Sequence, residues 1–110
     1  NMLSLLSFLS APGFSGYNAS KAAAWSMSMS LRAYLRPKGI EVINAFPAGI
    51  DTDMLAGVDG PKDSVQNVAR DVLEAIKTGE EDVYPASAKA VFDNWRTDQK
   101  AVEAAFAAMM

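Results

Sequence analysis

The residues best suited to acid–base chemistry in this sequence are Tyr17 and Lys21, four positions apart in the segment Y-N-A-S-K. At about 100° per residue, this spacing puts both side chains on one face of a helix, one turn apart. A lysine ammonium beside a phenol favours the phenolate and lowers its pKa from about 10. Tyr17 would then give or take a proton near neutral pH. The same spacing also occurs in solvated Tyr/Lys pairs at a protein surface. The surrounding sequence is therefore needed to distinguish a catalytic pair from a surface pair.

The composition narrows the chemistry that remains open. The 110 residues include no histidine and no cysteine, which excludes Cys/His zinc sites, disulfides, thiolate nucleophiles and imidazole proton relays, and we expect no metal. The net charge of −3 leaves no basic surface for nucleic acid. The longest charge-free apolar stretch, residues 22–31, is about half of what a membrane span requires. We expect a soluble, cytoplasmic protein that binds neither nucleic acid nor membrane.

The elements that would position Tyr17 and Lys21 follow from the placement of proline, glycine and apolar residues. Residues 1–6 form an apolar run that predicts the end of a strand, and residues 7–16 combine Ser, Pro and Gly in a loop. Residues 15–36 have no proline and are rich in Ala, Ser, Met and Leu, which predicts a long helix. Pro37 and Gly39 mark its end.

The middle of the chain repeats the alternation of strand and helix. Residues 40–46 are rich in β-branched residues and predict a buried strand, whereas the Gly- and Pro-rich residues 47–63 predict a mobile loop with at most one turn of helix. Asp63 or Ser64 caps a second helix that ends at Gly79. The apolar residues of this helix fall at helical spacing: Val65, Val68, Val72 and Ile76.

The C-terminal third predicts one more strand and two helices. Residues 83–85 form a short strand, Ser87 is placed to cap one helix, and Thr97 or Asp98 to cap another. Four apolar residues there have amphipathic spacing: Phe92, Trp95, Val102 and Phe106. They are most simply core residues, the alternative being that they line a substrate pocket.

This order of elements predicts an α/β fold with a doubly wound parallel sheet, similar to the Rossmann fold. In such sheets ligands bind at the carboxyl ends of the strands. Ser4 ends the first predicted strand, thirteen residues before Tyr17, and the segment P-A-G-I-D-T at residues 47–52 follows the next strand. Two loops and the start of the long helix therefore converge at one edge of the sheet.

The segments N-M-L-S at residues 1–4, Y-N-A-S-K and P-A-G-I-D-T together resemble the catalytic half of the classical short-chain dehydrogenase/reductase family. The resemblance implies an oxidoreductase that uses NADP or NAD to interconvert a small carbonyl compound and an alcohol. Tyr17 would exchange a proton with the substrate oxygen, which Ser4 would hold by a hydrogen bond. Lys21 would bind the ribose of the nicotinamide and lower the pKa of Tyr17.

The same resemblance implies cofactor contacts in the segment that begins at Pro47. Thr52 and the backbone of Ile50 would hold the carboxamide of the nicotinamide, and Pro47 would lie beside the cofactor. The family has Pro-Gly here, whereas this chain has Pro47-Ala48 with Gly49 one place later. We therefore expect a slightly shifted turn, which affects Ile50 more than Thr52.

The resemblance covers residues 1–110, which would be the C-terminal catalytic portion of a single domain. The Gly-rich turn that binds dinucleotide phosphates in this family would lie upstream of Asn1, so we expect a C-terminal fragment that lacks the dinucleotide-binding half and is inactive in isolation. Two alternatives stay open: a non-catalytic dimerisation or regulatory module that kept the fold, or a truncated product.

Apolar residues surround most of the predicted long helix: Trp25, Met27, Met29, Leu31, Tyr34 and Leu35. One face would pack on the sheet and another would need a second surface, which is either the protein's own interior or a subunit interface. In the family that this chain resembles, the helix commonly pairs between subunits. We therefore expect the intact protein to form a homodimer or homotetramer.

Overall fold

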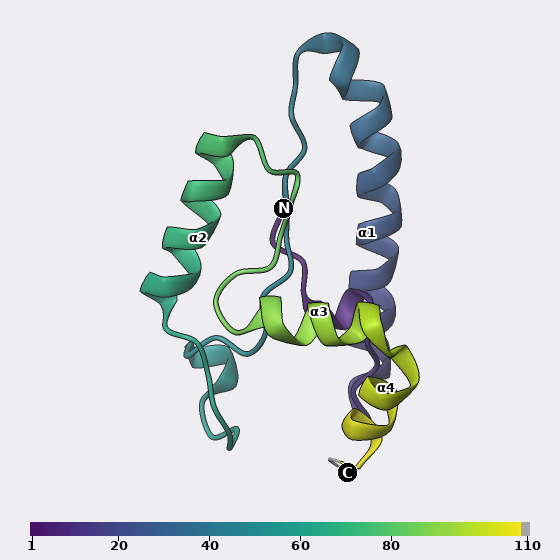
Figure 1. Ribbon diagram of the computed structural model, residues 1–110, viewed down its shortest axis with the longest axis vertical. Helices are drawn as coiled ribbons and strands as arrows, with labels where there is room; N and C mark the ends of the chain where they lie inside the picture. Colours follow the sequence, from purple (N-terminus) through teal and green to yellow (C-terminus); the bar gives the residue numbers. More distant parts are fainter. Residues whose placement is uncertain (109–110) are drawn as a thin grey trace.

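The computed structural model describes residues 1–108, in which two helices flank a small parallel sheet (Figure 1). Helix α1 (Ser15–Leu35) lies on one side of the strands and α2 (Val65–Thr78) on the other. Strand β1 (Asn44–Ala45) pairs in parallel with β2 (Asp82–Val83). The predicted α/β class with a parallel sheet is confirmed.

The N-terminal segment extends the sheet on the other side of β1. Met2 pairs in parallel with Ala45, and the Leu3 amide donates to the Ala45 carbonyl at 2.8 Å. The strand predicted over residues 1–6 is shorter, however, because a 3₁₀ helix, η1 (Leu5–Ser7), begins directly after Ser4. The hydroxyl of Ser4 accepts the Leu6 amide at 3.1 Å and so caps that turn.

Helix α1 has the predicted extent. It begins at Ser15, after a turn at Phe14 that provides no side-chain cap. A 3₁₀ turn, η2 (Arg36–Lys38), then leads to Gly39, whose positive φ of 76° ends the helical segment. Pro37 in this turn cannot continue an α-helical hydrogen-bond pattern, which explains the position of the stop.

The strand predicted over residues 40–46 shortens to β1, and Arg32 of α1 gives the reason. Its guanidinium donates twice to the Val42 carbonyl, at 3.2 Å each, and also forms a 2.8 Å ion pair with Asp82. Because the side chain of Arg32 occupies this carbonyl, regular pairing starts only at Asn44. Arg32 thereby ties α1 to both strands.

The loop after β1 forms the single turn of helix that was predicted, η3 (Asp53–Leu55). The sequence did not indicate that its two ends pair: the Asp63 amide donates to the Gly49 carbonyl at 2.8 Å, and the Asp51 amide to the Asp63 carbonyl at 2.9 Å. This backbone pairing closes the base of the loop.

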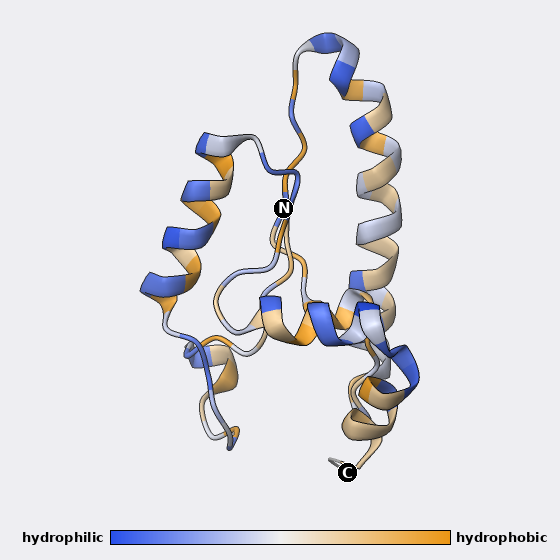
Figure 2. Ribbon diagram, viewed as in Figure 1, coloured by the Kyte–Doolittle hydropathy of each residue, from blue (hydrophilic) through white to orange (hydrophobic). Residues whose placement is uncertain are grey.

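Helix α2 is capped by Ser64, whose hydroxyl accepts the Asn67 amide at 3.1 Å, and ends at Gly79 with φ 76°. Its apolar side faces the strands, as Figure 2 shows. Val68 is buried, but Ile76 at the same helical face is about half exposed, so this face is only partly covered within the described residues.

The C-terminal third contains β2, one residue earlier than predicted, then α3 (Ala88–Thr97) and α4 (Gln99–Ala107). Asp98 caps α4 as expected by accepting the Ala101 amide at 3.0 Å. Ser87 precedes α3 but makes no side-chain cap, because its backbone is already helical (φ −66°, ψ −18°) rather than extended, and its hydroxyl donates to Asp63 at 2.7 Å. A polar link thus joins the base of the 49–63 loop to the start of α3.

An aromatic cluster joins the sheet, η1 and the C-terminal helices. Phe46 is fully buried, with its ring 4.8 Å from that of Phe8 and 5.0 Å from that of Trp25. The four residues predicted as core pack against this cluster: Phe92, Trp95, Val102 and Phe106.

The other side of α1 is open, so of the two alternatives for its second surface, the chain's own interior does not cover it within residues 1–108. Met27 is 65% exposed and Tyr34 76% exposed, whereas Trp25 and Leu35 are partly covered. Across residues 1–108, no helix is both long and apolar enough to cross a membrane.

Candidate active site

Ser4 follows the N-terminal segment that pairs with β1 through Met2, and it is buried, with 9% of its surface exposed. Its backbone is extended, and its hydroxyl oxygen accepts the Leu6 amide. A hydroxyl that accepts one bond still has its own proton to donate. Ser4 is therefore held in place by an acceptor bond and can donate to another oxygen.

Tyr17 and Lys21 share the first turns of α1, as the four-residue spacing predicted. The Lys21 Nζ lies 5.5 Å from the centre of the Tyr17 ring and donates to the Met2 carbonyl at 3.2 Å. Met2 is two residues before Ser4 in the N-terminal segment, and α1 packs against η1, which follows Ser4. Lys21 therefore connects the helix that carries Tyr17 with the strand that carries Ser4.

Pro47 begins the second loop at the same edge of the sheet. It is buried, and its carbonyl accepts the Leu5 amide at 3.0 Å, which holds it beside the residue that follows Ser4. The predicted convergence of the two strand ends is thus present for Ser4 and Pro47.

Ile50 and Thr52 lie further along that loop. In the parallel bridge between Ile50 and Asp63, the hydrogen bonds come from the residues on either side of Ile50, so its own amide and carbonyl face away from Asp63. The Thr52 hydroxyl donates weakly to the Ile50 carbonyl at 3.4 Å, and Thr52 is exposed. The backbone of Ile50 and the side chain of Thr52 are thus neighbours at an open surface.

The three tyrosines differ in their surroundings, which favours Tyr17 as the proton carrier. Burial, and next the negative charge of Asp82, raise the pKa of Tyr84 to about 12. Tyr34 lies seventeen residues beyond Tyr17 on α1, roughly 25 Å along the helix axis. Tyr17 is 40% exposed and is the tyrosine that has an ammonium group over its ring.

Comparison with known proteins places this arrangement in a family. The model of the short chain dehydrogenase family matches residues 1–63, which include all six candidate site residues. The chain belongs to the short-chain dehydrogenase family. Among solved structures it is similar to a short chain dehydrogenase from Burkholderia cenocepacia J2315 in complex with NADP, at 36% identity and a TM-score of 0.88. No curated protein matches the chain significantly.

The match to that dehydrogenase covers 96% of this chain and 45% of the other. The chain therefore spans somewhat less than half the length of the solved dehydrogenase. The similarity extends through α2, α3 and α4, beyond the range of the family model.

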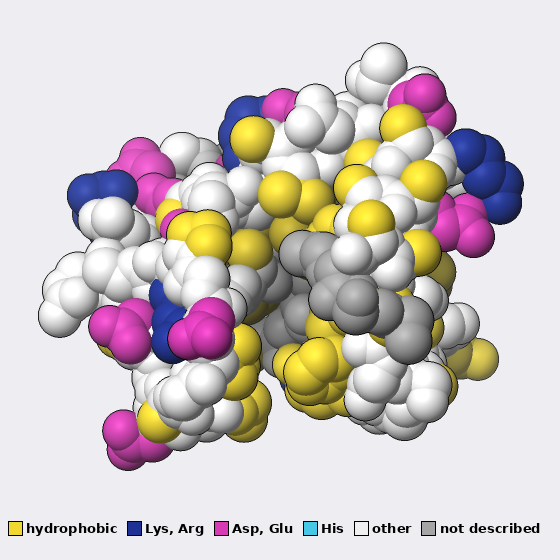
Figure 3. All heavy atoms as spheres, turned by 90° about the horizontal axis from the view of Figure 1, so that it is seen from below, with side chains coloured by type: hydrophobic (Ala, Val, Ile, Leu, Met, Phe, Trp, Pro, Cys, Tyr) yellow, Lys and Arg dark blue, Asp and Glu magenta, His cyan; other side chains and the backbone are white. Residues whose placement is uncertain are grey.

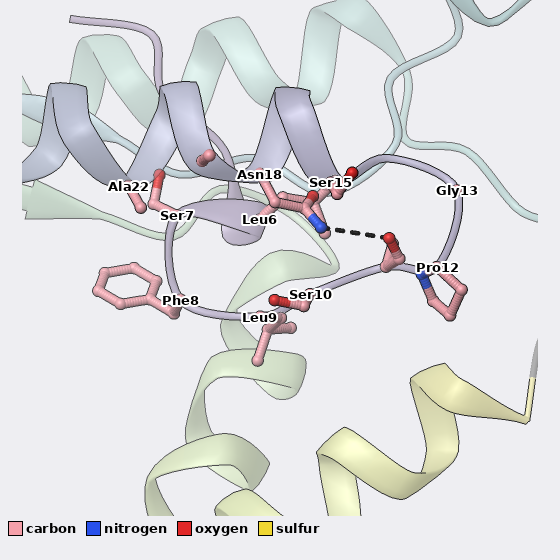
Figure 4. A pocket seen from close by; sticks show the side chains of 12 residues that line it. Leu6, Ser7, Phe8, Leu9, Ser10, Pro12, Gly13, Ser15, Asn18 and Ala22 are labelled. Carbon is pink, nitrogen blue, oxygen red and sulfur yellow. Dashed lines mark hydrogen bonds between the residues drawn. The ribbon is translucent and has the colours of Figure 1, made fainter.

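A cavity of about 520 Å³ lies between residues 6–13 and the start of α1 (Figure 4). Its helical wall consists of Ser15, Asn18, Ala19 and Ala22. Tyr17 and Lys21 project roughly 110–150° further round the helix, so the cavity lies behind them. None of its lining residues is charged.

The residue that sequence reasoning missed is Asn18, the second letter of Y-N-A-S-K. It is 7% exposed, and its Nδ2 donates to the Ala11 carbonyl at 3.2 Å, the bond drawn in Figure 4. The sequence shows that an asparagine directly follows the candidate tyrosine. It does not show that this asparagine is buried, or that it bonds to Ala11, because the partner is a backbone carbonyl.

The 49–63 loop contributes apolar surface beyond the site. Met54 is 81% exposed and Val58 46% exposed. Figure 3, seen from the end of the molecule where this loop lies, shows hydrophobic side chains gathered toward the middle of that face. These exposed side chains leave apolar surface at the end where the strands finish.

Proposed function

We propose that this chain is the catalytic part of an NAD(P)-dependent oxidoreductase that interconverts a carbonyl compound and an alcohol. One observation carries the proposal: the Lys21 Nζ lies over the Tyr17 ring while bonded to the strand that ends at Ser4. Family membership and the NADP bound to the similar dehydrogenase support it.

In this proposal Tyr17 exchanges the proton and Ser4 holds the reacting oxygen. During reduction, the phenol gives its proton to the carbonyl oxygen, and in the reverse direction the phenolate takes it back. The Ser4 hydroxyl donates to the same oxygen and fixes its position, because its acceptor lone pair already serves the Leu6 amide. The substrate is a small carbonyl compound or alcohol.

The donor set around Lys21 fits a nicotinamide ribose. An ammonium has three protons, and the Met2 carbonyl takes one of them. The others are directed away from this carbonyl and serve the ribose hydroxyls, while the Nζ itself lies 5.5 Å from the centre of the Tyr17 ring. The cofactor supplies hydride chemistry when bound.

The second loop would hold the carboxamide of the nicotinamide. The Ile50 amide and carbonyl face away from the ladder with Asp63, and the Thr52 hydroxyl is exposed next to them. A carboxamide has both donors and acceptors and would pair with these groups, which sets the face of the ring that meets the substrate. Pro47 lies beside the cofactor at the start of this loop.

Two further proposals concern the whole protein. The exposed apolar residues of α1 (among them Met27, Leu31 and Tyr34) form a subunit interface in a homodimer or homotetramer. Residues 1–110 alone are inactive, because the chain spans 45% of the similar NADP-bound dehydrogenase and its own sequence offers no Gly-rich turn for the phosphates.

The test is Tyr17→Phe in the longest natural protein that carries this sequence. Removal of the proton-bearing oxygen should lower kcat by about 10³-fold, within the range of general acid catalysis, and leave the Kd for NADP or NAD within about twofold. The comparison uses Asn94→Leu, at an exposed position of α3. Wild-type turnover by Tyr17→Phe would refute the assignment, and no turnover by the unsubstituted protein with any carbonyl substrate would favour a non-catalytic module.

A further inference from the structure

The start of α1 lacks the usual side-chain cap, although Tyr17 lies in its first turn. Phe14 at the cap position has no side-chain acceptor for the free amides of the helix. Helix starts without such a partner tend to fray. Some other contact has to hold this turn if the phenol is to keep a fixed position.

The Ala11 carbonyl provides that contact. It accepts the Phe14 amide at 3.2 Å and the Asn18 Nδ2 at 3.2 Å, so one oxygen anchors both ends of the turn that contains Tyr17. The backbone amide of Asn18 also donates to the Phe14 carbonyl at 2.8 Å. Figure 4 shows the Asn18 side chain crossing from the helix to the loop behind it.

We propose that Asn18 is a positioning residue for Tyr17: its side-chain amide locks the first turn of α1 onto the 8–13 loop and thereby fixes the phenol relative to Ser4. The inference rests on the proposed function. A bond at 3.2 Å from a side chain that is 7% exposed is partly shielded from competing water, which strengthens it as a tether. Lys21 has its own bond to Met2, so the tether serves Tyr17 separately.

The loss of this tether should affect turnover more than cofactor binding. A misplacement of about 1 Å in a reacting group can cost roughly 10²-fold in rate, so we expect about a tenfold lower kcat for Asn18→Leu. Leucine has nearly the same size and also removes the Asn18 Oδ1, which is buried without a partner among the described residues, so the variant should fold. KM for the cofactor should stay within about twofold.

The experiment compares Asn18→Leu, Asn18→Gln and the control Asn94→Leu, an exposed position of α3, in the longest natural protein that carries this sequence. Hydrogen exchange of the amides of residues 15–18 and kcat per folded molecule are measured for each. We expect faster exchange and lower kcat for Asn18→Leu, partial recovery of both for Asn18→Gln because it restores an amide donor, and neither effect for Asn94→Leu.

Three outcomes would overturn the inference: unchanged exchange in Asn18→Leu, faster exchange with unchanged kcat, or an equal fall in kcat and cofactor affinity with no recovery in Asn18→Gln. Tyr17→Phe is run in parallel to separate the two proposals. If Tyr17→Phe retains turnover, the proposed function fails, and if only Asn18→Leu behaves as the wild type, the tether fails alone.

Discussion

The two segments that form the proposed site are held in different ways. Tyr17 and Lys21 lie on a 21-residue helix, and Lys21 is bonded to the neighbouring strand. Pro47 is buried, but five residues later Thr52 is exposed, and the bond from its hydroxyl to the Ile50 carbonyl is long at 3.4 Å. The helical segment is fixed by packing, whereas the loop segment is fixed only at its base.

This difference indicates that the two segments contribute differently to the proposed reaction. The proton-transfer groups are organised before any ligand binds, so little ordering is needed there. The loop that would orient the nicotinamide has an exposed tip and would become ordered on binding, which costs affinity. Substitutions in the helical segment should therefore have larger effects than comparable ones in the loop.

After the loss of turnover expected for Tyr17→Phe, the largest effect is expected for Lys21→Met, which removes the charge from the helical segment. A charge-assisted hydrogen bond contributes about 1.5–3 kcal/mol, so the Kd for the cofactor should rise by about 10²-fold. Fluorescence titration of the cofactor measures this Kd. Lys77→Met, at an exposed position of α2, is the matched control, and an unaltered Kd would argue against the role of Lys21.

A smaller effect is expected for Thr52→Val in the loop segment. Valine keeps the shape and removes a neutral hydrogen bond worth about 1 kcal/mol, so cofactor affinity should fall by roughly fivefold to tenfold. Thr97→Val in α3 serves as control. A loss as large as that of Lys21→Met would contradict the contrast between the two segments.

A matched pair of glycine substitutions compares the backbones of the two regions. Gly13 has φ +83°, so Gly13→Ala should destabilise the turn beside the Asn18 tether by about 1 kcal/mol. Gly49 has no positive φ, and an added Cβ would meet Leu55 at an ordinary 3.4 Å, so Gly49→Ala should change stability by less than about 0.5 kcal/mol. Urea denaturation of both variants tests this, and the reverse order would refute it.

The smallest effect concerns the aromatic scaffold beneath both segments. The pKa of Tyr84 is raised to about 12 in the folded protein, against about 10 in the unfolded chain. The folded state therefore keeps this proton longer, and the contribution of Tyr84 to stability is constant below pH 10 and falls as the pH rises from 10 to 12. Between pH 9 and 11 the melting temperature of Tyr84→Phe should fall less than that of the wild type, and the two falls should differ by a few degrees.

Local sequence signals predicted the elements of the fold well. Proline and glycine positions gave the ends of α1 and α2, and Ser64 and Asp98 were recognised as caps. These features depend on residues within one or two turns of each other, which the sequence displays directly. The family could be identified for the same reason, since its motifs are short and contiguous.

Long-range contacts could not be predicted in the same way. Ser87 looks like a helix cap but bonds to Asp63, and Arg32 shortens a strand by occupying the Val42 carbonyl. In each case a polar side chain bonds to a partner that is close to it only in the folded chain. The local sequence pattern cannot identify such partners, because many donors and acceptors along the chain are equally compatible with it.

The sequence by itself determined the chemistry open to this protein: a phenol and an ammonium one helical turn apart, a serine at a strand end, and no imidazole or thiol. Only the tertiary structure decided that Lys21 reaches the Met2 carbonyl and that Asn18 reaches Ala11. The physical reason is that residue types fix which bonds can form, whereas a backbone carbonyl is present at every position, and only packing selects which carbonyl comes within reach.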